Sequence, residues 1–224
     1  MSRSTPIPSD PKIISYLTIR KVVGFIGIGI PVVLPLGNLV KDGCHTILSS
    51  ISAYYHTGVH DLFVGLLFAI ALFLFAYRGY DKKDVVAGNL GALLAVCIAF
   101  FPTSIEQTVS GCIPEKINTG ISNTMHFIAA GGFFLVLAYF SLILFTRDDG
   151  RPTEMKLKRN VVYRACGIIM LSCILIIGGK SILDHFRPEN LLQRLHGTFW
   201  LESLALWAFG ISWITKGKTL LTDR

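Results

Sequence analysis

Charged residues are scarce in this sequence. Asp, Glu, Lys and Arg make up 16% of the 224 residues, whereas 52% are hydrophobic and the mean hydropathy is +0.57. Soluble domains contain about 25% charged residues, so the composition argues against a soluble globular protein. Two long runs, Val22–Val40 and Leu62–Tyr77, contain no charged residue at all. Such runs are typical of membrane spans.

Little of the chain lies outside apolar runs, which leaves no room for a separate soluble domain. A helix needs about 20 mainly apolar residues to cross roughly 30 Å of hydrocarbon. The candidate runs are Val22–Val40, Leu62–Tyr77, Val85–Ile105, Thr124–Thr146, Val161–Gly179 and Gly197–Thr215. We therefore expect an all-α fold, a polytopic membrane bundle of six transmembrane helices. Residues 22–215 would form this domain, 1–21 a cytoplasmic tail with an interfacial segment, and 216–224 a second cytoplasmic tail.

Acidic residues are outnumbered, since 14 Asp and Glu face 21 Lys and Arg and the net charge is +7. If the N-terminus is cytoplasmic, 16 of the 21 basic residues fall on the inner side. This is the positive-inside bias, so we expect an N-in/C-in, multi-pass protein of the cell inner membrane. The inner basic residues are then expected to meet anionic membrane lipids, and we expect no nucleic-acid partner. The sequence leaves open whether the chain forms a homo-oligomer.

Carboxylates are almost absent from the apolar runs, and Glu202 is the only one well inside a run. A carboxylate within a membrane is costly and is by default functional or paired. Glu202 could act as a general acid or base or as a proton or cation site. Alternatively, it could form a structural pair with Lys180 or with a tyrosine hydroxyl. The chain also lacks a convincing internal repeat, which counts against a transporter built by duplication.

Against this apolar background one polar segment, residues 41–61, is conspicuous. Its sequence, KDGCHTILSSISAYYHTGVHD, holds three of the six histidines, three serines and two tyrosines. In the expected topology all the histidines lie on the outer side: His45, His56, His60, His126, His185 and His196. Imidazole is the commonest metal ligand and a proton carrier near neutral pH, although histidine also suits the membrane interface. We expect the segment to be either a helix or a re-entrant loop.

Within this segment Ser52, His56 and His60 are spaced i, i+4 and i+8, so in a helix they would share one face. His56 and His60 could then bind a metal together, and Asp61 could orient a histidine ligand through a hydrogen bond. As a nucleophile, Ser52 would need a base within hydrogen-bond reach. The plainer interpretation is a serine bonded to the backbone of its own helix.

Two of the five cysteines, Cys44 and Cys112, lie in expected outer loops, each directly after a glycine. Outside the cytosol such cysteines can pair, so we expect a disulfide that tethers the polar segment to the second outer loop. The remaining cysteines, Cys97, Cys166 and Cys173, lie within apolar runs and are expected to be packing residues.

The element Ser52-x-x-x-His56 followed by Asp61 resembles the Ser…His…Asp pattern of the alkaline ceramidase/adiponectin-receptor-like membrane hydrolases. In that family a serine, an aspartate and three histidines surround a zinc ion that activates water within the bilayer. The chain departs from the pattern, because it has six expected spans rather than seven. Its last run also has His196 but no His-x-x-x-His.

Two further resemblances concern the whole plan of the chain. The six-span plan, the serine- and aromatic-rich first outer loop and His126 at the start of the fourth run resemble the DRAM/Frag/Sfk superfamily. The run SISAYYHTGVHDLFVG, together with FLFAYRGYD, is similar to small bacterial six-helix membrane proteins that have no assigned activity. These resemblances imply a membrane bundle but no particular chemistry.

The function that we expect first is a metal-dependent hydrolase or transferase that acts on lipid or a lipid-linked substrate from the outer leaflet. The metal ligands would be His56, His126 and His196, and zinc is the metal that the first resemblance implies. Asp61 and Glu202 would orient ligands or move protons, and Ser52 would position the water. Two alternatives stay open: a channel or proton-coupled transporter with Glu202 as the ion site, and a non-catalytic membrane scaffold of the DRAM kind.

Overall fold

The computed structural model describes residues 16–79, 81–105, 108–109, 111–113, 115–148, 150, 152–186 and 197–217. Their helices are α1 (Tyr16–Asp42), η1 (Ser52–His56), α2 (His60–Ala76), α3 (Lys82–Phe100), α4 (Ile121–Tyr139), η2 (Phe140–Leu144), α5 (Glu154–Phe186) and α7 (Gly197–Lys216). Element η1 is a 3₁₀ turn, and η2 is a π-helical turn that continues α4. Across these described ranges the only extended pairing is two isolated bridges, Ile105–Ile117 and Val109–Ile113. The expected all-α fold is confirmed.

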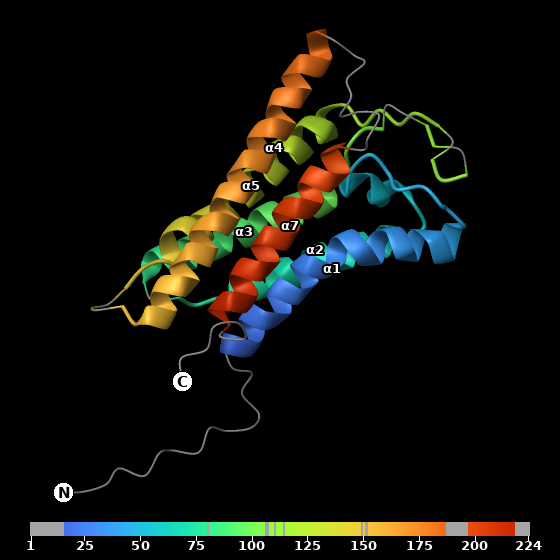
Figure 1. The fold of residues 1–224 in the computed structure, drawn as a ribbon. Coiled ribbons are helices and arrows are strands. Elements are labelled where there is room, and N and C mark those ends of the chain that lie inside the picture. The colour runs from blue at the N-terminus through green and yellow to red at the C-terminus, as the bar shows by residue number, and fades with distance from the viewer. Residues whose placement is uncertain are drawn as a thin grey trace, which may run out of the picture.

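Four helical stretches are long and apolar enough to cross a membrane: Leu17–Asp42, Lys82–Phe100, Ile121–Leu144 and Glu154–Lys180. Helix α2 is also apolar but has only 17 residues. Helix α7 packs along both α1 and α5 (Figure 1). Most of its residues are buried. Helix interfaces within membranes tolerate small and hydroxyl-bearing residues. The serine and glycine residues of α7 suit such a position between two neighbouring helices.

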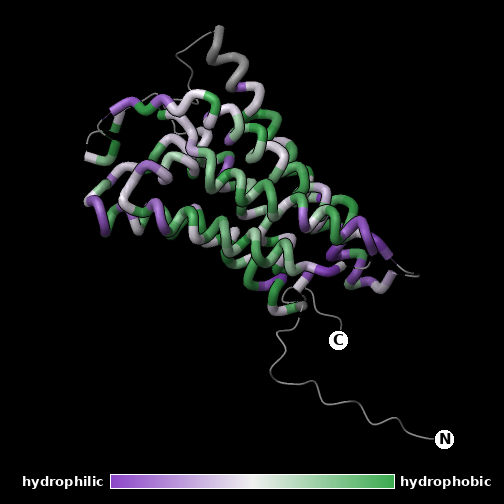
Figure 2. The backbone as a smooth tube through the Cα atoms, turned by 180° about the vertical axis from the view of Figure 1, so that it is seen from behind, coloured by the Kyte–Doolittle hydropathy of each residue, from purple (hydrophilic) through white to green (hydrophobic). Residues whose placement is uncertain are grey.

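The six α-helices of the described residues form a closed ring in which each packs against the next. The order around the ring is α1, α2, α3, α4, α5 and α7. Helix α7 returns to pack against α1, beside which it lies in Figure 1. Hydrophobic residues line the helices, and hydrophilic ones gather toward the two ends of the bundle (Figure 2). We call the end that carries residues 43–59 the polar end, and the end where α2 leads into α3 the basic end.

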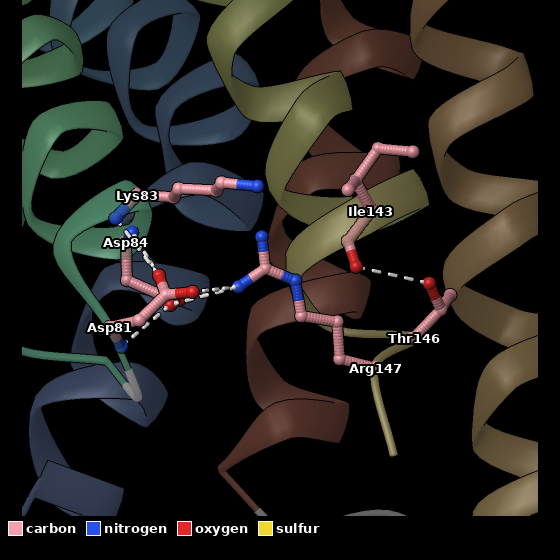
Figure 3. A network of polar contacts seen from close by, with 6 residues as sticks. All are labelled: Asp81, Lys83, Asp84, Ile143, Thr146 and Arg147. Carbon is pink, nitrogen blue, oxygen red and sulfur yellow. Dashed lines mark hydrogen bonds and ion pairs between the residues drawn. The ribbon is translucent and has the colours of Figure 1, made fainter. Parts of the chain in front are cut away.

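The basic end is held together by Arg147, which follows α4 and η2. Its Nη1 atom lies 3.0 Å from Asp81 Oδ2 and 3.5 Å from Asp84 Oδ2 (Figure 3). Asp81 also caps α3, because its carboxylate accepts hydrogen bonds from the amides of Lys83 and Asp84 while Asp84 accepts one from the Asp81 amide. This reciprocal capping box fixes the first turn of α3, and Arg147 ties that turn to the end of the α4 segment.

At the polar end, residues 43–59 of the polar segment form a loop with one helical turn. Helix α1 ends at Asp42, η1 forms a single 3₁₀ turn, and α2 begins at His60. Gly43 has a φ of +66°, a region that glycine adopts without steric cost, so the chain can turn directly after α1. The histidines at 56 and 60 and Ser52 therefore do not lie on one continuous helix.

Candidate functional site

The loop 43–59 is fastened to the helices on both sides. The Gly58 amide donates a hydrogen bond of 2.6 Å to Asp42 Oδ2 at the end of α1. The Phe199 amide, in the first turn of α7, donates one of 2.9 Å to the Ser49 carbonyl. Both bonds use backbone atoms of the loop, so they fix its path without depending on the side chains at positions 49 and 58.

A buried tyrosine holds η1 from within. Tyr54 is fully buried, and its hydroxyl oxygen accepts a hydrogen bond of 3.3 Å from the Leu48 amide. Its ring packs against Phe199 of α7, with ring centroids 6.4 Å apart. Burial raises the pKa of Tyr54 above its usual value, more than the Leu48 amide lowers it, so the hydroxyl stays neutral at physiological pH. The turn that carries Ser52 is therefore anchored to the bundle.

The structure brings Ser52 and His126 together. Ser52 Oγ lies 2.8 Å from His126 Nε2, and His126 Nδ1 lies 2.7 Å from the Phe101 carbonyl oxygen. A carbonyl oxygen can only accept, so Nδ1 must carry the imidazole hydrogen and Nε2 of the neutral ring is an acceptor. The Ser52 hydroxyl therefore donates to Nε2. This is the arrangement in which a base activates a serine nucleophile.

The loop after α3 is shaped by polar side chains at the start of α4. Asn123 Oδ1 accepts hydrogen bonds from Thr103 Oγ1 at 3.0 Å and from the Ser104 amide at 2.8 Å. Ser122 Oγ donates to the Pro102 carbonyl at 3.0 Å. These bonds surround the backbone that follows the carbonyl bound by His126, and they keep that carbonyl aimed at the imidazole.

The expected disulfide is confirmed. Cys44 and Cys112 are bonded to each other, with their Cα atoms 5.4 Å apart and a separation of 68 positions in sequence. The bond joins the loop that carries Ser52 to the loop that follows α3. Because Phe101, which holds His126, begins that second loop, the disulfide connects the supports of both members of the pair.

Glu202 supports the same turn from α7. Its Oε2 atom accepts a hydrogen bond of 2.6 Å from the amide of Ile51, the residue that precedes Ser52. Lys180, which the sequence offered as a partner, donates from Nζ to Thr198 Oγ1 at 3.1 Å. Glu202 is thus placed to position Ser52 through the backbone.

The predicted metal ligands are arranged differently. His126 uses both ring nitrogens for the bonds to Ser52 and Phe101, and His56 Nε2 donates to the Thr103 carbonyl at 2.7 Å. His196 lies outside the described residues. Among the residues that the structure does describe, no three His, Cys, Asp or Glu side chains are grouped so that they could hold a metal ion. The metal site stays a prediction, and we derive no step through it.

Two other predicted residues have surroundings of their own at the start of α2. Asp61 is exposed in the first turn of α2, and His60 Nδ1 donates to the Tyr55 carbonyl at 2.8 Å. The sequence pointed to Ser52 and His126 separately but gave His126 the role of a metal ligand. The group that orients it, the Phe101 carbonyl, belongs to the backbone and leaves no signal in side-chain chemistry.

Comparison with known proteins adds no family to these observations. No protein-family model, curated protein or solved structure matches the chain. What the protein does must therefore be inferred from Ser52, His126 and the residues that hold them.

Proposed function

We propose that this protein is a membrane-embedded hydrolase or acyltransferase with Ser52 as the nucleophile and His126 as the general base. One observation carries the proposal: the hydrogen bond of 2.8 Å between Ser52 Oγ and His126 Nε2, in a ring whose Nδ1 hydrogen is held by the Phe101 carbonyl. His126 is only 3% exposed, whereas Ser52 is half-buried. The nucleophile is thus the member of the pair that a substrate can reach.

The reaction that fits this pair is acyl transfer. Ser52 Oγ attacks the carbonyl carbon of an ester while its proton passes to His126 Nε2. The new Oγ–C bond forms, the ester C–O bond breaks, and the leaving alkoxide takes the proton back from His126. Water or a second alcohol then attacks the acyl carbon while its proton passes to the same nitrogen. The Oγ–C bond breaks, and Ser52 Oγ takes that proton back from His126. The Phe101 carbonyl holds the ring throughout and faces the positive charge that the imidazolium carries.

A lipid ester is the substrate class that the surroundings support. Large apolar side chains lie on the outer surface of the helical bundle, where Leu72 is 65% and Leu175 is 74% exposed. In a membrane these faces lie in the hydrocarbon core, so the end of the bundle meets the interfacial region where lipid ester groups lie. Ser52 sits at that end, in a loop directly above the helices.

We further propose six spans with both termini in the cytoplasm, which places the polar end outside the inner membrane. Helices α2 and α7 lie in the ring between longer apolar helices, which supports their crossing with them. The disulfide at the polar end fits an oxidising compartment, and the excess of basic residues at the other end fits the cytoplasmic side.

The test is covalent labelling of the purified protein in detergent with a fluorophosphonate, which reacts with serines activated by a base. We expect one label, on Ser52, and none in Ser52→Ala. His126→Gln keeps a hydrogen-bonding side chain that cannot take up a proton, so labelling should slow by about 100-fold or more. Ser49→Ala is the matched control, because Ser49 is exposed in the same loop and uses only its carbonyl.

Two results would contradict the proposal. One is labelling of Ser52→Ala at the wild-type rate. The other is a wild-type protein that is folded, as shown by a cooperative thermal unfolding transition, but in which Ser52 reacts no faster than Ser49.

A further inference from the structure

An open groove runs between α3 and α4 at the basic end, whereas Ser52 lies at the polar end. It has a volume of about 480 Å³, and its walls are largely apolar. Val86 and Leu90 of α3 form one wall and Leu135 of α4 belongs to the other, and these side chains are 65%, 45% and 52% exposed. In a bundle that crosses a membrane, a groove with such walls faces the acyl chains of the bilayer.

The groove ends at two lysines. Lys82 and Lys83, in the first turn of α3, line it together with Tyr139, which lies one turn beyond Leu135 toward the same end. Figure 3 shows the Lys83 side chain extending from α3 toward α4. A tyrosine and lysines at the end of an apolar stretch are typical of the level of lipid head groups.

The nearby carboxylates are bound to partners other than these lysines. Asp81 and Asp84 both pair with Arg147, at 3.0 and 3.5 Å, and both carboxylates also accept backbone amide hydrogens. Within the described part of the chain, no carboxylate lies within ion-pair distance of Lys82 or Lys83. Two ammonium groups are thus left facing the mouth of an apolar groove.

We propose that this groove binds one anionic phospholipid of the bilayer. One acyl chain lies between α3 and α4 along Val86, Leu90 and Leu135, and the head-group phosphate lies between the ammonium groups of Lys82 and Lys83. The charge complementarity selects an anionic lipid over a zwitterionic one, and the apolar walls select a lipid over a free phosphate ion. The site is separate from the Ser52–His126 pair and does not depend on its activity.

The experiment is native mass spectrometry of the intact 224-residue chain in detergent, titrated with phosphatidylglycerol or with phosphatidylcholine of the same acyl chains. We expect one phosphatidylglycerol to bind with higher affinity than phosphatidylcholine. Lys82→Gln/Lys83→Gln should weaken that binding by about 30-fold, since each lysine contributes roughly fivefold. Val86→Trp should abolish it with both lysines in place, because the indole fills the groove, and Leu90→Trp provides a second variant of the same wall.

Matched controls keep charge and bulk effects apart. Lys158→Gln/Arg164→Gln removes two exposed cations from α5, and Val161→Trp adds an indole at an exposed valine of the same helix. Both should bind phosphatidylglycerol like the wild type. Equal weakening in Lys158→Gln/Arg164→Gln would mean general surface attraction and would overturn the proposal. Unchanged binding in both tryptophan variants of the groove, or equal binding of the two lipids, would also overturn it. So would a lipid-free dimer that Val86→Trp dissociates, because a second copy of the chain would then be the occupant of the groove.

Discussion

The hydrogen on His126 Nδ1 decides what Ser52 can do. In hydrolases with a third acidic residue, a carboxylate holds that hydrogen and stabilises the imidazolium. Here the Phe101 carbonyl at 2.7 Å takes its place. A carbonyl fixes the same tautomer but carries no charge, so it stabilises the protonated ring less. We therefore expect His126 to activate Ser52, but we expect Ser52 to react more slowly than the serine of a complete triad.

Glu202 binds the amide next to the proposed nucleophile, and this makes its role testable. Glu202→Ala would leave the Ile51 amide without its acceptor in a residue that is only 5% exposed, which should cost about 1–3 kcal/mol of unfolding free energy. Glu202→Gln keeps an acceptor oxygen and should cost less. Thermal unfolding in detergent, read beside the rate of Ser52 labelling, checks both.

The two readouts separate positioning from direct chemistry at Glu202. If Glu202 positions Ser52, Glu202→Ala should lower both the unfolding temperature and the rate of Ser52 labelling. Glu202→Gln should then restore most of both. If Glu202→Gln stopped the labelling of Ser52 while unfolding at the wild-type temperature, the carboxylate itself would be required, and the backbone role assigned here would be wrong.

Among the elements, the contact between α1 and α7 closes the ring and depends on glycine. A Cβ atom at Gly210 would lie 2.5 Å from the Gly24 carbonyl oxygen, and one at Gly24 would lie 2.7 Å from the Gly210 carbonyl oxygen. The neighbouring atoms are backbone and cannot swing away. Each helix therefore approaches the other as closely as a residue without a side chain allows.

Gly210→Ala should consequently push α7 away from α1 and destabilise the bundle by about 1–3 kcal/mol. Gly29→Ala, in α1, is the matched control, because a Cβ there meets nothing within 4 Å. That change should be neutral or slightly stabilising, since alanine favours a helix over glycine. Thermal unfolding of both variants in detergent is the measurement, and equal losses in the two would show that the close contact is not what matters.

The helices could be predicted from the sequence because burial in lipid and burial in a core both require apolar residues. Each of the six expected runs overlaps a helix, and the disulfide between Cys44 and Cys112 followed from two cysteines in expected outer loops. The hydropathy of the sequence does not reveal which helix is surrounded by others. Helix α7 is largely buried between α1 and α5, and its serines and tryptophans do not indicate this position.

The site was less accessible to prediction because it is made by tertiary contacts. Ser52 and His126 are 74 residues apart, and no periodicity links a 3₁₀ turn to the start of α4. Helical spacing drew attention to Ser52, His56 and His60 as one face, but the chain turns at Gly43 and restarts its helix at His60. His126, the proposed base, was among the histidines singled out, but its proposed role required knowledge of the carbonyl at its other nitrogen.

On the scale of the whole molecule, α7 connects the two ends. Its first turns hold the loop of Ser52 through the Phe199 amide and Glu202, and its last turns place Trp213 among the buried rings of Tyr77 and Phe145 at the basic end. The catalytic pair proposed at one end and the lipid groove proposed at the other are thus parts of one closed ring. Which side of the membrane each end faces follows from the topology.

That topology can be tested with single cysteines in a Cys97→Ser background, since the other free cysteines, Cys166 and Cys173, are buried. Lys116→Cys lies exposed at the polar end and Arg78→Cys lies exposed at the basic end. In intact cells a membrane-impermeant maleimide should label position 116, and it should label position 78 only after permeabilisation. This pattern would put Ser52 and the disulfide outside the cytoplasm and the lysines of the groove at the inner leaflet. The reverse pattern would place the basic end outside, against the positive-inside bias, and would move the proposed lipid ester to the inner leaflet.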